Sequence, residues 1–296
     1  MLTLHPDQIY MTMKKILIII TAVLLPVLAQ AQAQINTKKV KIGDFTEKVT
    51  KVVLSGNQFI DGILQDEIAA RWRISPYEFC THQEFEDLKT SSDYYFLMTT
   101  TGQFRKESGP SIQYLTIVKG GPEAEIGLDK MLEVVSMPIA SAQFPSGREL
   151  VFLPAMLDII QDYTMDSMDE DTKAYGGLGV YASRIMKNNN FNIVFAEDDL
   201  ASSVDETVRN KYFNGNITSA DVDDSDKFLK ENAESTLVSY TVAPFDPQPG
   251  SFCYKMLIDT QNYRLYYFKK DKISKKKGAG FSAADLKKIC PAKKTK

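Results

Sequence analysis

Apolar positions in the first part of the chain follow the two-residue period of strands in some stretches and the longer period of helices in others. They predict strands at 51–54, 74–79, 94–100 and 112–118, an amphipathic helix at 58–72 and a short helix ending at 88. Thr81 and Glu84 have the spacing of a capping box, which supports a helix start there. Gly120-Gly121-Pro122 ends this series.

A similar order of elements returns after Asn190. The pattern predicts strands at 191–196, 236–242, 252–258 and 263–268 and a short strand starting at 217. It also predicts a helix from the cap at 203 to about 213 and another at 223–233. Ser203-x-x-Glu206 caps the first of these helices, and the last two strands form a hairpin around 259–262.

Residues 123–188 separate the two series and are predicted to be helical. One helix carries the apolar residues Ile126, Met131, Leu132, Val134 and Val135, and another runs from Glu149 to about Met168. Gly176-Gly177 breaks the helical pattern beyond that second helix. These helices are too apolar to remain solvated, so we expect them to pack on the sheets.

The two series align with each other at a nearly constant offset. Residues 111–118 match 251–258 at an offset of 140, while Ile74 with Ile217 and Ser92 with Ser235 give 143. This regularity predicts an internal duplication. The alternative is that any two α/β domains can be aligned in this way.

The resulting fold prediction is α+β. It consists of two related α/β sandwich domains, each ordered strand-helix-strand-helix-strand-strand, with a mainly antiparallel sheet and helices on one face. The predicted boundaries are 34–122 for the first domain, 123–189 for the helical spacer, 190–290 for the second domain and 291–296 for a basic tail.

Residues 13–33 have the three parts of a secretory signal peptide. Lys14 and Lys15 precede an apolar run from Ile16 to Leu28, and an Ala-x-Ala site comes after it. The run is shorter than the roughly 20 residues needed to cross a bilayer. We therefore expect residues 1–12 to precede the true start, the signal to be removed, and the protein to be periplasmic or secreted, without a transmembrane segment.

Composition narrows the function classes. The chain has 296 residues, 44% hydrophobic and 25% charged, which is typical of a globular protein and excludes collagen, a disordered chain and a multi-span membrane protein. Two histidines argue against a multi-histidine metal site. Cys80, Cys253 and Cys290 allow at most one disulfide, and their apolar neighbours favour buried free thiols.

Charge is distributed unevenly along the chain. Residues 269–296 carry +9, whereas residues 34–268 carry −13. Lys275, Lys276 and Lys277 are the candidate binding residues, since clustered lysines attract anionic surfaces. An equally simple explanation is that lysines protect a sheet edge. Phe281 is the only aromatic residue after 268, which does not favour nucleic acid.

Three aspartates recur at helical spacing, and they are the candidate metal ligands. Asp158, Asp162 and Asp166 lie at i, i+4 and i+8, and a hard cation such as Ca²⁺ would relieve their repulsion. The alternative is a solvated acidic face.

Two other stretches imitate known sites without completing them. In 221–226, the sixth position of a calcium loop is Asp226 instead of glycine, so a helix start is the better interpretation. Gly176-Gly-Leu-Gly179 lacks the Gly-Lys-Ser/Thr of a phosphate loop and indicates a helix break.

Cys80 and His82 are the only neighbouring Cys and His residues in the sequence. A thiolate nucleophile needs a base and an orienting group, which usually come from separate elements. We therefore assign no catalytic residue and no cofactor. A helix-start histidine beside a buried cysteine explains the pair.

The element order resembles the amino-terminal domain of TolB, an α/β sandwich also found in CsgG and related envelope lipoproteins. The residues that carry the resemblance are 64–74, Phe85-x-x-Leu88 and 92–97, with a weaker match in the second half at Val208, Tyr212, Ile217, Phe228-Leu229 and 235–237. It implies a role in envelope assembly or interaction. The chain departs from the family in lacking a lipid-anchor cysteine and in its duplication.

These observations predict a non-enzymatic envelope protein that acts by binding or assembly. Its expected partner is an envelope protein or an anionic surface. Two alternatives remain open: a secreted hydrolase that uses paired carboxylates, or a module that binds a small ligand in the cleft between the halves.

Overall fold

A computed structural model describes residues 37–290, apart from residues 106, 186–189, 214, 249 and 275–277. The expected signal peptide and the candidate lysines Lys275, Lys276 and Lys277 therefore lie outside the described residues. Among the described helices, none is both long and apolar enough to cross a membrane.

The first half contains one five-stranded sheet and its helices. Its elements are α2 (Lys38–Lys41), η1 (Phe45–Glu47), β1 (Val49–Val53), α3 (Gln58–Arg71), β2 (Tyr77–Cys80), α4 (His82–Leu88), β3 (Tyr94–Gly102), β4 (Ile112–Lys119), η2 (Pro122–Glu125), η3 (Leu128–Lys130) and β5 (Leu132–Ser141). The strand order is β2-β1-β3-β4-β5. β1 is parallel to β2 and β3, while β4 is antiparallel to β3 and β5.

Helical segments connect the halves, and the second sheet comes after them. The connecting segments are α5 (Arg148–Asp169), α6 (Asp171–Gly176) and η4 (Gly177–Tyr181). The second half comprises β6 (Asn192–Ala196), η6 (Glu197–Asp199), α7 (Glu206–Tyr212), β7 (Ile217–Ala220), α8 (Val222–Lys230), β8 (Thr236–Val242), β9 (Phe252–Asp259), β10 (Leu265–Lys272) and α9 (Ala283–Ile289). Its strand order is β10-β9-β8-β6-β7.

Both sheets have the same order and the same strand directions. In each, the first strand lies between the second and third in parallel pairing, and the remaining two strands extend the sheet by antiparallel pairing. The sheets are therefore mixed, with two parallel and two antiparallel pairs each, whereas the sequence suggested mainly antiparallel sheets.

Alternating side chains place each sheet between two apolar layers. In β8, Val238 and Tyr240 join the large core that both halves share, while Leu237 joins a second core under α7 and α9. In β3, Leu97 faces the shared core and Phe96 faces a third core with α4. Helices thus cover both faces of each sheet, which corrects the prediction that they cover one face.

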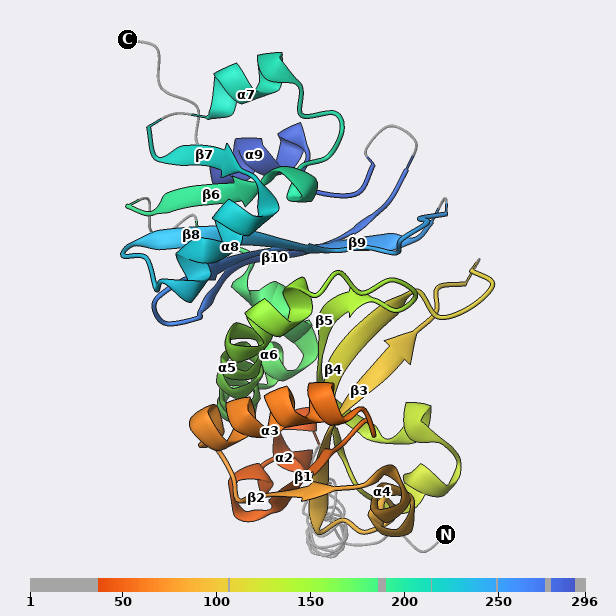
Figure 1. Ribbon diagram of the computed structural model, residues 1–296. Helices are drawn as coiled ribbons and strands as arrows, with labels where there is room; N and C mark the ends of the chain where they lie inside the picture. Colours follow the sequence, from red (N-terminus) through yellow and green to blue (C-terminus); the bar gives the residue numbers. More distant parts are fainter. Residues whose placement is uncertain are drawn as a thin grey trace, which may run out of the picture.

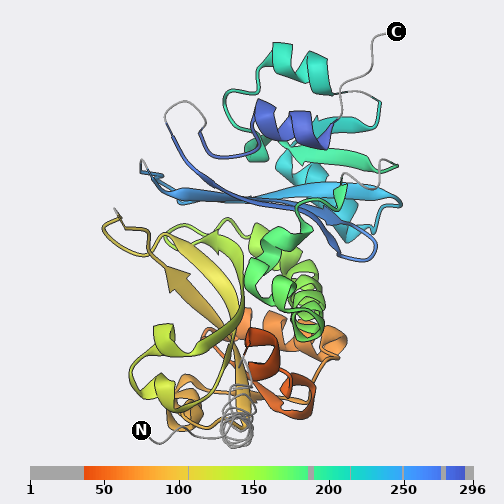
Figure 2. The same cartoon turned by 180° about the vertical axis from the view of Figure 1, so that it is seen from behind.

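α5 and α6 lie between the two sheets, as both views show (Figures 1 and 2). Phe152, Met156 and Ile160 of α5 are fully buried and belong to the shared core. The predicted helix at 149–168 and its packing on the sheets are confirmed.

The predicted helix around Ile126–Val135 is wrong. Two short 3₁₀ turns are followed by β5, which pairs with β4 along its whole length. Met131, Val134 and Val135 satisfy a helical spacing over a short window, but the open edge of β4 provides backbone hydrogen-bond partners that a helix would leave unused. The first sheet consequently extends to Ser141, past the expected boundary at 122.

Three smaller expectations have clear outcomes. The Thr81–Glu84 capping box is present at the start of α4, whereas α7 is capped by Asp205 instead of Ser203. α6 ends at Gly176, and Gly177 takes a φ of 58°, so the glycine pair is a helix break. The predicted basic tail, 291–296, lies outside the described residues, and α9 is the last element before it.

Candidate functional site

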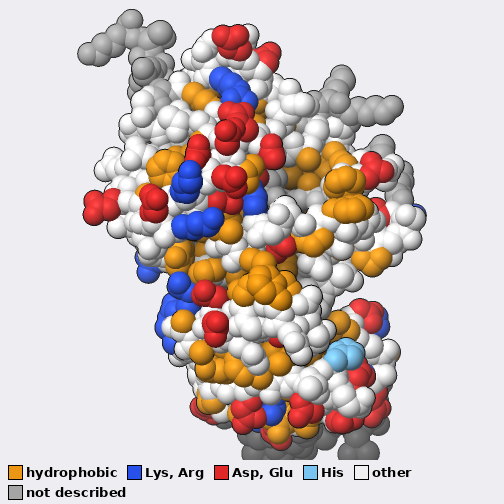
Figure 3. Space-filling view, viewed as in Figure 1, with side chains coloured by type: hydrophobic (Ala, Val, Ile, Leu, Met, Phe, Trp, Pro, Cys, Tyr) orange, Lys and Arg blue, Asp and Glu red, His pale blue; other side chains and the backbone are white. Residues whose placement is uncertain are grey.

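The two halves meet through one continuous apolar core with polar contacts at its edges. The Tyr240 hydroxyl donates to the carbonyl of Ile139 at 2.5 Å. Tyr114 and Tyr254 place their hydroxyls 2.8 Å apart. Apolar side chains also gather where the halves adjoin (Figure 3).

One part of this boundary opens into a pocket of about 700 Å³, which we call the junction pocket. It is lined by Ala140, Ser141, Phe144, Ser146 and Arg148 before or at the start of α5, and by Asp198, Asp199, Val222, Asp223, Tyr240, Thr241, Val242, Ala243, Phe245, Ala279 and Gly280 from the second half. Its volume is within the range of small-molecule sites.

Sheet topology explains why a pocket forms there. β6, β7 and β8 run parallel, so their carboxyl ends share one edge, and residues just after or at each end line the pocket. β6 and β8 are neighbours in the sheet, and the chain leaves them in opposite directions. From β6 it continues to β7, and from β8 it continues to β9. The crevice between two such strands is where open α/β sheets commonly bind ligands.

Arg148 is the buried charge at the base of the pocket. Its Nε and Nη2 donate to both carboxylate oxygens of Asp226 at 3.0 and 2.8 Å, and its Nη1 donates to Asp199 at 3.1 Å. The side chains of Arg148, Asp199 and Asp226 are 12%, 3% and 4% exposed. Such a two-pronged geometry fixes the guanidinium.

The surroundings of this triad keep Arg148 charged. Burial opposes the charged form, but attraction to Asp199 and the hydrogen bonds with Asp226 outweigh it, so the pKa of Arg148 lies above its ordinary value. The guanidinium also lies 5.1 and 5.3 Å from the ring centroids of Tyr240 and Phe152.

Two glycines allow the backbone to hold these groups. Gly147 takes a φ of 88° directly before Arg148, the first residue of α5. Gly280, with a φ of 93°, lies so close to the chain at Asp199 that a Cβ would be 2.6 Å from the Asp199 carbonyl oxygen. Phe281 N–H donates to that carbonyl at 2.7 Å, which ties the loop after β10 to the carboxyl end of β6.

An aromatic pair and two carboxylates form the exposed rim. Phe144 and Phe245 are 60% and 66% exposed, and their ring centroids lie 4.3 Å apart across the boundary of the halves. Asp198 and Asp223 are exposed, and within the described part of the chain neither forms an ion pair or a side-chain hydrogen bond.

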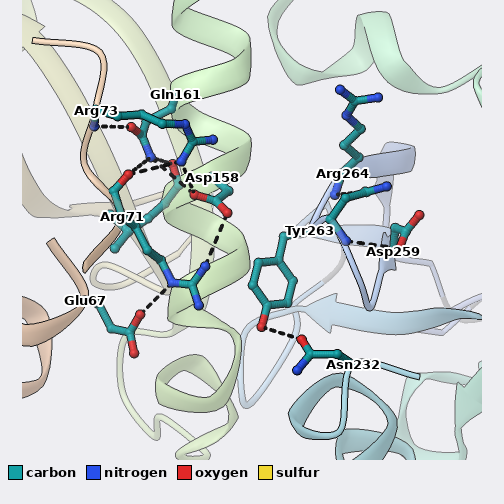
Figure 4. Close-up of polar contacts among 11 residues, drawn as sticks. Glu67, Arg71, Arg73, Asp158, Gln161, Asn232, Asp259, Tyr263 and Arg264 are labelled. Atoms are coloured by element: carbon teal, nitrogen blue, oxygen red, sulfur yellow. Dashed lines mark hydrogen bonds and ion pairs between the residues drawn. The ribbon is translucent and has the colours of Figure 1, made fainter. Parts of the chain in front are cut away.

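The candidate metal ligands lie on one face of α5, on another part of the boundary. Asp158 accepts from Arg73 at 3.1 Å and from Arg71 at 3.4 Å (Figure 4). Asp166 accepts from Lys173 at 3.3 Å and from the Tyr181 hydroxyl at 2.8 Å.

Asp162, the middle aspartate, is half-buried. Burial raises its pKa, while attraction to Arg264, Arg184 and Arg73 opposes the rise. The row of aspartates is thus matched by cations, most of them arginines. In the described residues, no group of three or more His, Cys, Asp or Glu side chains is arranged to hold a metal ion.

Second-half residues face this acidic row. Tyr263 lies over the Arg71 guanidinium, with 4.8 Å between the guanidinium carbon and the ring centroid, and its hydroxyl donates to Asn232 at 3.2 Å (Figure 4). The row of aspartates therefore helps to join the halves through its arginine partners. Neither interpretation of the sequence, a metal site or a solvated acidic face, predicted this role.

The remaining candidates lie away from the junction pocket or are structural. Cys80, Cys253 and Cys290 are buried and free, as expected, and His82 is an exposed residue in the first turn of α4. Residues 222–230 form α8, which confirms the helix start at 221–226.

Sequence reasoning missed Arg148, Asp199 and the rim phenylalanines. The available signal was the run Glu197-Asp198-Asp199 directly after a predicted strand, since polar residues at the carboxyl end of a parallel strand often line a site. Arg148 gave no signal, because its partners are 51 and 78 positions away.

A second pocket, of about 650 Å³, lies within the first half around Gly120 and Gly121. Two of its lysines are already paired, Lys119 with Asp44 and Lys130 with Asp129. The junction pocket is the stronger candidate because it combines a strand-end location with rim carboxylates that are unpaired within the described chain.

Comparison of the chain with models of known protein families, with curated proteins and with solved structures gives no match.

Proposed function

We propose that this protein is exported to the bacterial envelope and acts there by binding a small ligand in the junction pocket. The observation that carries the proposal is the pocket itself, with its preformed Arg148 triad below and the Phe144–Phe245 pair at the rim. A rigid polar base and an apolar rim are the usual features of a ligand site.

The geometry favours binding over carboxylate catalysis. Asp199 and Asp226, the buried carboxylates at the base, are both hydrogen-bonded to Arg148. A general acid and base must reach the substrate, and buried carboxylates held by a guanidinium are poorly placed to do so.

A ligand screen with matched variants tests the binding proposal. The mature chain is screened by thermal shift against a panel of amines, carboxylates, sugars and nucleosides, and hits are located by hydrogen exchange. We expect protection at 141–148 and 241–246. Phe245→Ser should weaken hits about tenfold, from the loss of roughly one aromatic contact, whereas Phe59→Ser, which removes a 69% exposed phenylalanine on α3, should not.

Two results would contradict the proposal. One is a panel in which no compound stabilises the protein. The other is a set of hits that respond equally to Phe245→Ser and to Phe59→Ser, because those compounds would bind outside the junction pocket.

The export part of the proposal is supported by the signal-like segment at 13–33 and by the resemblance to TolB and CsgG domains. Expression of residues 13–296 in a bacterium, followed by intact-mass measurement, tests it. A product that starts near Gln32 or Gln34 is expected. A cytoplasmic product that retains Met13 would contradict export.

We also infer that the halves arose by duplication. Their sheets share one strand order, and residues aligned at an offset of 140 meet in space. Tyr114 contacts Tyr254, and Ser111 and Ser251 both donate to Glu107, at 2.5 and 2.7 Å. Contact between equivalent residues is characteristic of two copies that pair through the same surface.

A further inference from the structure

The junction pocket carries an excess of negative charge. Its charged lining residues within the described chain are Arg148, Asp198, Asp199 and Asp223. Arg148 is neutralised by Asp199 and by Asp226 immediately behind it. Among these described residues, a ligand that enters therefore meets two unpaired carboxylates, Asp198 and Asp223, and no unpaired cation.

The aromatic rim adds a second selectivity for cations. Phe144 and Phe245 are both exposed residues of the pocket lining, and their rings are tilted by 44° to each other. Aromatic faces attract ammonium and guanidinium groups, most strongly where the contact is desolvated. The same rings bury apolar surface of a ligand.

From these observations we propose that the ligand of the junction pocket is a small organic cation, an ammonium or guanidinium compound with an apolar group. This inference rests on the proposed binding function. The occupant is argued from charge complementarity with Asp198 and Asp223, and from a volume of about 700 Å³, which suits a small molecule.

In the bound arrangement, the charged head lies near the two exposed carboxylates and against one ring of the Phe144–Phe245 pair, and the apolar group packs on the same rim. The Arg148 triad holds the floor of the pocket rigid. An anionic ligand would be repelled by Asp198 and Asp223. Among the described lining residues, no free cation is present to offset that repulsion.

Three probes of similar shape but different charge test the inference. They are 2-phenylethylammonium, 2-phenylethanol and 3-phenylpropionate, each titrated calorimetrically into the mature chain at low ionic strength. We expect the ammonium to bind about tenfold more tightly than the alcohol, from two carboxylates and the aromatic rim. The carboxylate should bind most weakly, and salt should weaken only the ammonium.

Charge-removing variants locate the effect. Asp198→Asn and Asp223→Asn should each weaken the ammonium about two- to fivefold and leave the alcohol unchanged. Asp66→Asn, which alters an exposed carboxylate on α3 without a partner in the described chain, is the matched control and should change neither.

The outcomes separate this inference from the proposed function. If the alcohol binds as tightly as the ammonium and the Asn variants have no effect, the cation inference is wrong while pocket binding stands. If none of the three probes binds and the wider panel also gives no hit in the pocket, both are wrong.

Discussion

The phenolic oxygens of Tyr114 and Tyr254 lie 2.8 Å apart, so the two halves touch through residues at matching positions of their sequences. Their rings cross nearly at right angles, with centroids 5.9 Å apart. Burial raises the pKa of both phenols, so both donate or accept as neutral hydroxyls.

Removal of either hydroxyl should have similar consequences. Tyr114→Phe and Tyr254→Phe should each lower the free energy of unfolding by about 1–2 kcal/mol, because the remaining hydroxyl loses its partner. The double variant should be little worse than either single variant, since no orphaned hydroxyl remains. Urea denaturation of the four proteins measures this, and strictly additive losses would contradict a direct hydroxyl pair.

Arg148 should matter more for stability than an exposed arginine. Arg148→Met leaves Asp199 and Asp226 buried without their cation, and we expect a loss of about 3–5 kcal/mol. Arg73→Met is the control. Its side chain is 58% exposed, so its pairing with Asp158 should contribute at most about 1 kcal/mol. Equal losses in the two variants, measured by chemical denaturation, would show that the buried triad has no special role.

Gly280 should tolerate no side chain. Gly280→Ala combines a positive φ with a Cβ only 2.6 Å from the Asp199 carbonyl oxygen, and we expect a loss of about 2–4 kcal/mol. Gly56→Ala measures the cost of the positive φ alone, because Gly56 has a φ of 85° but open space around the added Cβ. It should lose about 1 kcal/mol. The shift in thermal midpoint of each variant checks the difference.

Stability should depend on pH through Asp285, the capping-box carboxylate in the first turn of α9. Burial would raise the pKa of Asp285, but hydrogen bonds from Lys255 and Lys269, both at 2.6 Å, hold it well below the ordinary value. Because the folded-state pKa is depressed, this contribution is full above the unfolded pKa of about 4 and is lost as pH falls below it.

Asp285→Asn should therefore cost about 2–4 kcal/mol near neutral pH, because it removes the buried carboxylate that Lys255 and Lys269 share and leaves both lysines paired with Asp271. The difference from the unaltered protein should shrink as pH falls from about 4 to 2. Asp93→Asn, on an exposed carboxylate paired with Lys48, should show little effect at any pH. A difference in the free energy of unfolding between Asp285→Asn and the unaltered protein that stays constant with pH would contradict a depressed pKa for Asp285.

The three thiols should react slowly in the folded protein. Burial raises the pKa of Cys80 and Cys253 to about 11 and that of Cys290 to about 12, so little thiolate is present near neutral pH. Titration with a chromogenic disulfide reagent at pH 8 should detect almost no thiol in the native protein and three after denaturation. Rapid reaction of the native protein would show that a cysteine is accessible.

Local patterns were sufficient to predict most elements. The alternating residues of 236–242 and the helical spacing of 58–72 depend on near neighbours, and β8 and α3 appear with nearly those bounds. The same reasoning failed at 126–135, because an edge strand exists only when a neighbouring strand offers hydrogen bonds. It also placed Asp158, Asp162 and Asp166 correctly on one helix face, while their arginine partners could not be predicted.

The sequence by itself determined most of the order of strands and helices, with β5 the exception, and also the capped start of α4, the burial of the cysteines and the alignment of residues 111–118 with 251–258. These features arise from periodicity and local hydrogen bonding, which act over a few residues. Only the tertiary structure decided that β5 completes the first sheet, that the acidic row faces arginines, and that Arg148 reaches Asp199 and Asp226 under the Phe144–Phe245 rim. Those contacts join residues far apart in the chain, and their geometry is set by how the two sheets pack around α5.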